Sequence, residues 1–88
     1  MEIIELNTLK EQDIQDLLGL MEVLDGSVKV TPQILIAAAQ APETHLFAAV
    51  EEGRIVGTAS LCITHHPLGL KGGIEDVVVS PEDRKSVV

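Results

Sequence analysis

The sequence has almost no aromatic residues, since Phe47 is the only one and neither Trp nor Tyr occurs among the 88 residues. Stacking of bases or sugar rings on aromatic faces is therefore nearly excluded. Basic residues are also scarce, because six Lys and Arg stand against fourteen Asp and Glu, which gives a formal net charge of −8. Nucleic acids and anionic lipids are bound by clustered cations, so the composition argues against both kinds of partner.

Cysteine is scarce, and long apolar runs are missing as well. The single Cys62 cannot close an internal disulfide, and its place in the middle of an expected strand favours inert packing. No apolar run approaches the roughly 18–20 residues that span a bilayer. The amino end, Met1–Leu6, has two acids and no basic segment, so it is not a signal peptide. We therefore expect a cytoplasmic globular protein with an aliphatic core.

The first half of the chain predicts a short strand and two helices. Glu2–Leu6 is β-prone, and Thr8 and Glu11 have the spacing of a capping box at a helix start. Asp25-Gly26 should end this first helix. The second helix should begin at Thr31-Pro32 and end at Ala41-Pro42. The apolar positions of the two helices are Ile14, Leu17, Leu18 and Met21, and Ile34, Leu35, Ala38 and Ala39.

From His45 onwards the hydrophobic period changes to two, which indicates strands. His45–Glu51 and Arg54–Thr64 should form a hairpin across the Glu52-Gly53 turn. His65–Gly72 is expected to be a loop, and Gly73–Ser80 a third strand. The uninterrupted valines at positions 77–79 predict that both faces of that strand are covered. In the longer hairpin strand, residues 55, 57, 59, 61 and 63 should face one way and residues 56, 58, 60, 62 and 64 the other.

A helix start follows at Ser80-Pro81, with Glu82 and Asp83 in the first turn. The order of elements predicts the α+β class: a strand, two helices, an antiparallel three-stranded sheet and the start of a further helix. Only a few residues separate that start from Val88. Residues 1–88 are therefore expected to form a single incomplete domain, the amino-terminal part of a larger one.

Two segments resemble a known family. EEGRIVGTASLCIT (51–64) and GGIEDVVVSPEDR (72–84) are similar to the central part of GNAT-superfamily N-acetyltransferases, in which a strand of the form I-E-(D/N)-V-x-V leads directly into a helix. The similarity covers about residues 45–84, whereas residues 1–44 match in element order only. Within the family, Ile74–Val79 is most similar to glucosamine-6-phosphate N-acetyltransferases. The resemblance implies the amino-terminal half of the GNAT fold and transfer of an acetyl group from acetyl-CoA to a primary amine.

The resemblance also implies a cofactor site. Acetyl-CoA would lie as an extra strand along the backbone of Val77, Val78 and Val79. Its pyrophosphate would rest on the next helix start, where Arg84, Lys85 and Ser86 occupy the positions of the family's Gly-rich turn. This turn departs from the family pattern because it contains no glycine. Residues 1–88 are thus expected to form a domain that is truncated at the pyrophosphate-binding turn and is inactive alone. The family's general acid, often a Tyr, is expected to lie outside these residues.

Glu75 is the candidate catalytic residue, because a carboxylate at its position could accept the proton of the attacking amine. Asp76, expected on the opposite face, and His66 are candidates for binding substrate together with Glu75. The alternatives are a solvated acid for Glu75, a partner of a cation or backbone N–H for Asp76, and an ordinary surface residue for His66. A metal site is not expected, because no third ligand has suitable spacing near the two adjacent histidines.

Two functions remain open from the sequence. The first is acetyl transfer to an aminosugar phosphate or another small amine, and the acidic net charge favours a cationic amine. The second is a catalytically inactive half of an acetyltransferase that pairs its exposed strand edge with another chain. A homo-oligomer is expected in either case.

Overall fold

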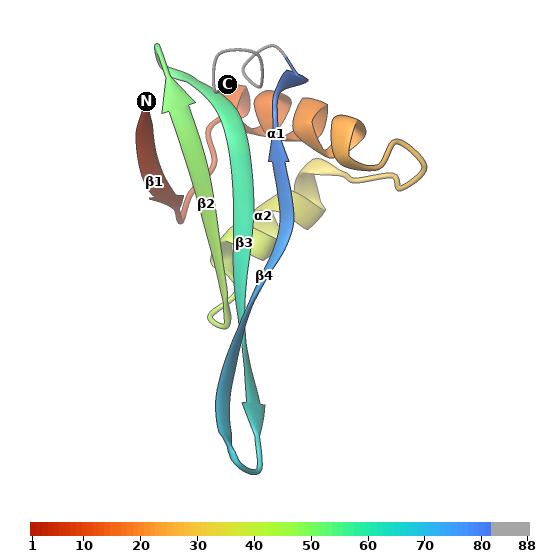
Figure 1. Ribbon diagram of the computed structural model, residues 1–88. Coiled ribbons are helices and arrows are strands. Elements are labelled where there is room, and N and C mark those ends of the chain that lie inside the picture. The colour runs from red at the N-terminus through yellow and green to blue at the C-terminus, as the bar shows by residue number, and fades with distance from the viewer. Residues whose placement is uncertain (82–88) are drawn as a thin grey trace.

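Two helices cover one face of a four-stranded antiparallel sheet in the computed structural model, which describes residues 1–81 (Figure 1). The strands lie in the sheet in the order in which they occur in the sequence. The predicted α+β class is confirmed, and the first strand extends the three-stranded sheet to four. The elements are β1 (Glu2–Leu6), α1 (Glu11–Leu24), α2 (Pro32–Gln40), β2 (Thr44–Glu51), β3 (Arg54–His66) and β4 (Gly69–Val79).

The start of α1 differs from the sequence prediction. Lys10, not Thr8, is the N-cap residue, and its backbone N–H donates to Asp13 Oδ2 at 3.0 Å. The capping box predicted for Thr8 and Glu11 is therefore wrong, because Asp13 supplies the carboxylate one turn into the helix. The end of α1 was predicted correctly, since Asp25 caps the helix with its N–H bonded to the Met21 carbonyl at 2.9 Å.

The second helix has the start and end that the sequence predicts. The Thr31 side chain accepts a hydrogen bond from the Ile34 N–H at 3.3 Å, and Pro32 occupies the first turn. Ala41 caps the other end. The local sequence signals alone therefore fix the bounds of α2, because both depend on neighbouring residues only.

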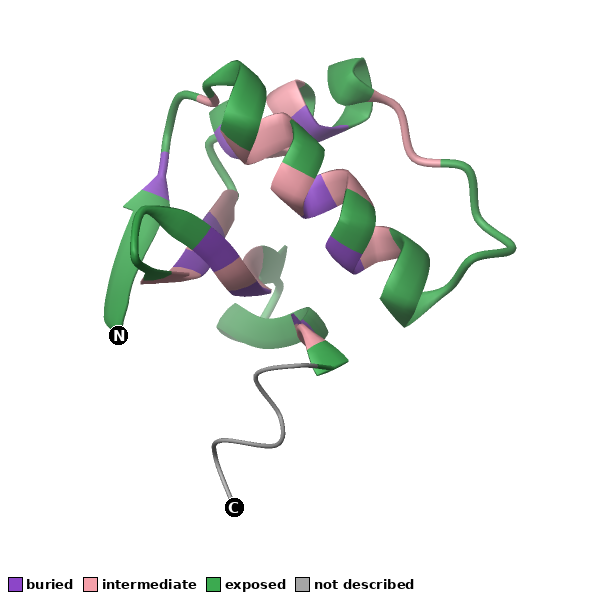
Figure 2. Cartoon of the chain, turned by 90° about the horizontal axis from the view of Figure 1, so that it is seen from above, coloured by how far each residue is buried: buried purple, intermediate pink, exposed green. Residues whose placement is uncertain are grey.

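The core is aliphatic and lies between the two helices and the sheet (Figure 2). In α1 the buried residues are Leu17 and Leu20, and Leu20 is absent from the apolar positions predicted from the sequence. In α2, Leu35 and Ala39 are buried, whereas Ile34 is 53 % exposed. Each buried Leu contributes about 1.5–3 kcal/mol of transfer free energy. The remaining core residues are Leu6, Leu46, Ala48, Ile55 and Val78.

A bulge near the start of β3 decides which of its faces meets the helices. Val50 pairs with Ile55 but Ala49 pairs with Gly57, so Val56 is an extra residue on β3. As a result the predicted alternation fails there, and Ile55 lies on the same face as Thr58. Thr58 is buried on the helix side, where its hydroxyl donates to the Phe47 carbonyl at 2.8 Å.

Gly57, Ala59 and Leu61 of β3 therefore lie on the opposite, open face of the sheet. Gly57 and Ala59 contribute to a shallow apolar hollow of about 160 Å³ on that face. No helix among residues 1–81 covers this face (Figure 1). The residues of the hollow that belong to this face are Ile3, Phe47, Ala49, Gly57, Ala59 and Val79.

The expected loop at His65–Gly72 is wrong, because this segment continues the sheet. β3 runs to His66, β4 starts at Gly69, and only Pro67 and Leu68 join them. The hairpin projects beyond the other strands as an arm, residues 63–72 (Figure 1). Its histidines and glycines are typical of loops, but ladder hydrogen bonds involve only backbone groups and can include such residues.

A second bulge interrupts β4. Glu75 pairs with Ser60 and Val78 pairs with Thr58, so Asp76 and Val77 together lie opposite one residue of β3. Asp76 has a left-handed φ of 53°, a conformation that Asp adopts more readily than most residues. Paired residues share a face, so the bulge places Glu75 and Val78 on the same side of the sheet.

The bulge corrects two predictions about β4. Simple alternation, which placed Asp76 on the face opposite Glu75, does not hold across it. The valines are also not covered on both faces, because Val78 is 2 % exposed whereas Val77 is 56 % exposed. The helix start predicted at Ser80-Pro81 lies, apart from these two residues, outside the described residues. Within residues 1–81 no helix is long and apolar enough to cross a membrane.

One ion pair joins α1 to the β2–β3 turn. The Arg54 Nε donates to both carboxylate oxygens of Asp16 at 3.1 Å, and the Ile55 N–H donates to Asp16 Oδ2 at 3.1 Å. Only 5 % of the Asp16 side chain is exposed. The hydrogen bonds from Arg54 hold the pKa of Asp16 below its usual 3.8. The carboxylate therefore stabilises the fold only while it is ionised.

Replacing this carboxylate should destabilise the chain in a pH-dependent way. We expect Asp16→Asn to lower the free energy of unfolding at pH 7 by about 1–3 kcal/mol, because charged hydrogen bonds are lost at a part-buried site. Since the folded pKa is lowered, the contribution is complete above about pH 4 and disappears as the pH falls through the folded value. The difference between the variant and the parent should therefore shrink towards pH 3.

Urea unfolding at pH 7 and at pH 3 measures both effects. Glu11→Gln is the matched control, because it removes one negative charge from the exposed first turn of the same helix. Equal destabilisation by the two substitutions, or a difference that does not depend on pH, would contradict the role of Asp16.

Candidate functional site

The outer edge of β4 is the first part of the candidate site. β4 is the last strand of the sheet, and within residues 1–81 no strand pairs with its outer edge. Val77, which belongs to the bulge, and Val78 and Val79, which follow it, lie on this edge. Backbone N–H and C=O groups along such an edge can pair with an extended ligand as they would with another strand.

A hollow adjoins the bulge on the helix side of the sheet. This inner hollow has a volume of about 430 Å³ and lies between β4, the end of α1 and the segment that joins α1 to α2. Two acids, Asp25 and Asp76, contribute to it. Its other lining residues are apolar: Met21, Leu24, Val28, Val30 and Val77. The inner hollow can thus hold a small ligand beside the bulged edge.

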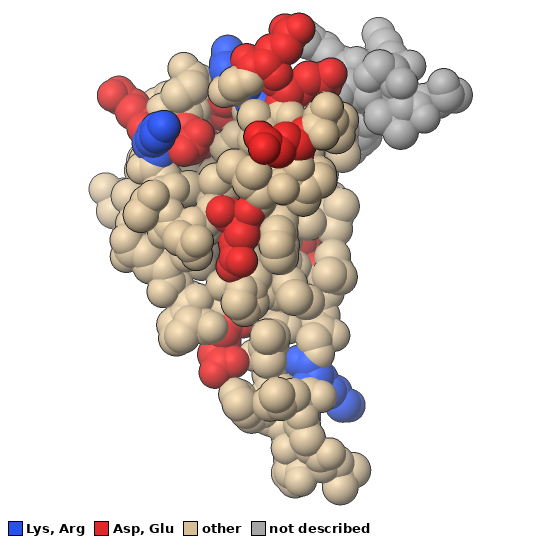
Figure 3. Space-filling view, turned by 90° about the vertical axis from the view of Figure 1, so that its left-hand side faces the viewer, with Lys and Arg blue, Asp and Glu red and all other residues tan. Residues whose placement is uncertain are grey.

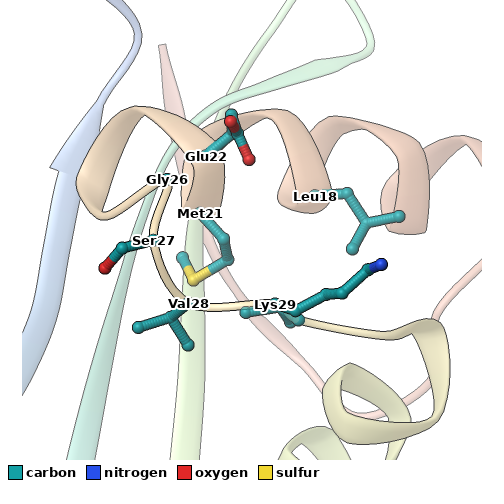
Figure 4. A pocket seen from close by; sticks show the side chains of 8 residues that line it. Leu18, Met21, Glu22, Gly26, Ser27, Val28 and Lys29 are labelled. Carbon is teal, nitrogen blue, oxygen red and sulfur yellow. The ribbon is translucent and has the colours of Figure 1, made fainter.

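A second hollow continues from the first along the α1–α2 segment. This outer hollow shares Met21, Val28 and Val30 with the inner one and also has a volume of about 430 Å³. Figure 4 shows Leu18 and Met21 projecting from α1 towards the segment that carries Val28 and Lys29. The two hollows share three lining residues, and of the two the inner one includes residues of β4.

Close contacts at the end of α1 shape the outer hollow. A Cβ atom on Gly26 would lie 3.0 Å from Glu22 Oε1, so a residue without a side chain lets the connection pass close to Glu22. Asp25 Oδ1 accepts hydrogen bonds from the Ser27 hydroxyl at 2.6 Å and from the Ser27 N–H at 3.0 Å. These two bonds lower the pKa of Asp25, so its carboxylate is charged at neutral pH.

The predicted acids lie at the bulge, on neighbouring positions. Glu75 is exposed and, by its pairing with Ser60, belongs to the helix-covered side of the sheet. Asp76 lines the inner hollow. The structure therefore brings Asp76 together with Val77 at the hollow and places Glu75 next to them in the strand.

His66 is not brought together with these residues. It lies in the arm, six residues along β3 from Ser60, the partner of Glu75, which corresponds to about 20 Å of extended strand. Its Nε2 bonds to the Thr64 hydroxyl at 3.0 Å. Lys71 pairs with Thr64 in the same arm. Figure 3 shows the acidic side chains over the main body and none over the tip of the arm on that face.

The residues predicted to bind the pyrophosphate, Arg84, Lys85 and Ser86, lie outside the described residues. Within residues 1–81 no three His, Cys, Asp or Glu side chains are grouped as metal ligands.

The sequence analysis missed the residues of the two hollows in the α1–α2 segment. Their signal was available in Asp25-Gly26-Ser27, a turn between two helices, because binding residues are common in such connections.

Comparisons with known proteins agree with this geometry. Residues 12–86 match the family model described as the acetyltransferase (GNAT) family. A protein from Agrobacterium tumefaciens described as an acetyltransferase has 26 % sequence identity and a TM-score of 0.78, and the match covers 98 % of this chain. An acetyltransferase from Trypanosoma brucei has 33 % identity and a TM-score of 0.65 over 97 % of this chain. Among curated proteins, none matches at a significant level.

A glucosamine-6-phosphate N-acetyltransferase from Arabidopsis thaliana is also similar, with 26 % identity and a TM-score of 0.63 over 99 % of this chain. The chain spans 63 % of the length of the Agrobacterium and Trypanosoma structures and 65 % of the Arabidopsis one. The fold predicted from the resemblance, the amino-terminal portion of the GNAT fold, is therefore confirmed. With a family model that matches most of its residues, the chain belongs to the GNAT family of acetyltransferases.

Proposed function

We propose that the protein transfers an acetyl group from acetyl-CoA to the primary amine of a small molecule. The observation that carries the proposal is the outer edge of β4 at a bulge, which no strand within residues 1–81 pairs with, in a chain of the GNAT family. A bulge bends its strand and ends regular pairing. It thus opens a place where an extended, amide-containing cofactor can pair with the edge.

In this proposal, backbone groups of Val77, Val78 and Val79 pair with the amides of the acetyl-CoA pantetheine. The edge position of these residues supports it, because their outward backbone groups have no strand partner within residues 1–81. Arg84, Lys85 and Ser86 are proposed to hold the pyrophosphate at the following helix start. A helix start attracts phosphate through its free N–H groups and dipole, and two of the three residues carry positive charge.

Glu75 is proposed as the base for the amine. An ammonium must lose a proton before its nitrogen can attack the thioester carbonyl carbon. The new C–N bond then forms as the C–S bond breaks, the nitrogen loses one further proton to give the amide, and the CoA sulfur leaves as a thiolate that takes up one proton. Asp76 is proposed to hold the acceptor in the inner hollow, which it lines. The position of His66 on the arm does not support a contact with the same acceptor.

The narrower assignment, acetylation of an aminosugar phosphate, rests on the Ile74–Val79 segment and on the similarity to the Arabidopsis glucosamine-6-phosphate N-acetyltransferase. That similarity is shared with several other acetyltransferases that match the chain equally well or better in TM-score. The aminosugar type is therefore one candidate among small amines.

Hydrogen exchange tests the proposed cofactor edge. We expect acetyl-CoA at 100 times its dissociation constant to slow amide exchange at residues 77–79 by up to about 100-fold, because pairing protects those amides. β1, the other edge strand, is the internal control and should not change. The measurement is exchange mass spectrometry on the protein expressed from its full natural reading frame. Protection that spares β4, or that appears equally in β1, would overturn the proposal.

The role of Glu75 has a kinetic test. We expect Glu75→Gln to lower kcat by about 100-fold or more, the usual effect of losing a general base. The KM for acetyl-CoA should hardly change, because the cofactor is held by backbone groups. CoA release measures both constants, and Glu2→Gln in the distant β1 strand is the control. A variant with unchanged kcat would show that Glu75 is a solvated surface acid.

A second candidate function, strand pairing between copies, is favoured by the same edge together with the apolar hollow on the open face. Exposed edges and apolar patches are typical pairing sites. In that case the protein should sediment as a dimer, and a charge placed on the open face by Ala59→Lys should dissociate it. A strictly monomeric mass at high concentration would argue against this candidate.

A further inference from the structure

The lining of the inner hollow discriminates among acceptors of the proposed acetyl transfer by their charge. Asp25 and Asp76 both contribute to it, and its lining within the described part of the chain includes no Lys, Arg or His. Asp25 is held in its ionised form by the two hydrogen bonds from Ser27. A phosphate group in this hollow would meet two carboxylates without a cation, which is strongly unfavourable.

The rest of the lining favours an aliphatic skeleton. The side chains of Met21, Leu24, Val28, Val30 and Val77 offer no hydrogen-bond donors. The hydroxyl groups of a sugar would lose water there without finding side-chain partners, which costs free energy. A chain of methylene groups would instead bury apolar surface against these residues.

The outer hollow does not supply a phosphate site that would change this balance. Among residues 1–81, Lys29 is the one basic residue that lines it, and this residue is exposed. Glu22 lines the same hollow and offsets the charge of Lys29. An acceptor that extends from the inner into the outer hollow therefore still meets a surface with more negative than positive charge.

The number of carboxylates also bears on the acceptor. The nitrogen that attacks the thioester must be neutral when it reacts, so it cannot balance the charge of either carboxylate at that moment. A second, protonated nitrogen on the same molecule could remain paired with Asp25 throughout the reaction. We propose that the inner hollow binds a diaminoalkane, a primary amine on an unbranched aliphatic chain that carries a second ammonium group and no phosphate.

A panel of three acceptors tests this inference, which rests on the proposed acetyl transfer. The probes are 1,4-diaminobutane, n-butylamine and glucosamine 6-phosphate, each measured by CoA release from acetyl-CoA. We expect kcat/KM to be highest for the diamine, about fivefold lower for n-butylamine, which lacks the second ammonium, and lowest for the sugar phosphate. A highest value for glucosamine 6-phosphate would overturn the inference.

The variant Asp25→Asn tests how much the second ammonium group of the diamine contributes to binding. Asn keeps an oxygen that can accept the hydrogen bonds of Ser27, so the turn should be preserved. We expect the variant to raise the KM for the diamine about fivefold and to leave n-butylamine unchanged, so that the two become equivalent. Glu11→Gln, which removes a charge on the opposite end of α1, should preserve the discrimination. Equal effects of Asp25→Asn on both amines would contradict the proposed pairing.

Two binding measurements separate the failure of this inference from the failure of the proposed function. Calorimetry with acetyl-CoA tests the function alone, and no binding would end it. In the protein without acetyl-CoA, 1,4-diaminobutane should shift the NMR signal of the Met21 methyl group, and the shift should be weaker in Asp25→Asn. A missing shift, or one equally strong in the variant, would overturn the diaminoalkane site whatever acetyl-CoA does.

Discussion

The bulge in β4 is the constraint on which the proposed site depends. It inserts Asp76 in a left-handed conformation and makes two residues of β4 face one residue of β3. With this extra residue in the strand, Val78 lies in the core while Val77 stays 56 % exposed and lines the inner hollow. Without it, the alternation of β4 would carry on unbroken, and Asp76 and Val77 would not meet the end of α1 at one hollow.

The helices support this edge from the face of the sheet that they cover. α1 is held to the β2–β3 turn by Asp16, which bonds both Arg54 and the backbone of Ile55. The same helix ends at Asp25 beside the inner hollow, so its position determines the distance between Asp25 and the bulge. The ion pair between Asp16 and Arg54 thus helps to hold the helix whose last turn borders the candidate acceptor site.

Local signals in the sequence were sufficient for the helices but not for the irregular parts of the sheet. Thr31-Pro32 and Asp25 mark helix ends correctly, because caps depend on residues within one turn. The bulges at Val56 and Asp76 depend on pairing between strands, so period-two alternation missed both. The sequence predicts a loop for the arm because glycine and histidine are common in loops, whereas the hydrogen bonds that pair its strands involve backbone groups only. For the site, the I-E-D-V-V-V segment predicts a cofactor edge on β4 and stays a prediction, whereas the hollows formed with the α1–α2 segment needed the tertiary structure.

In the proposed complex, a thioester cofactor completes the sheet along the edge of β4. A crystal structure of the protein bound to CoA would show whether it does. We expect pantetheine amide atoms at about 3 Å from backbone atoms of residues 77–79, the usual distance of a hydrogen bond. CoA bound elsewhere, with that edge paired to another strand of the same chain, would contradict it.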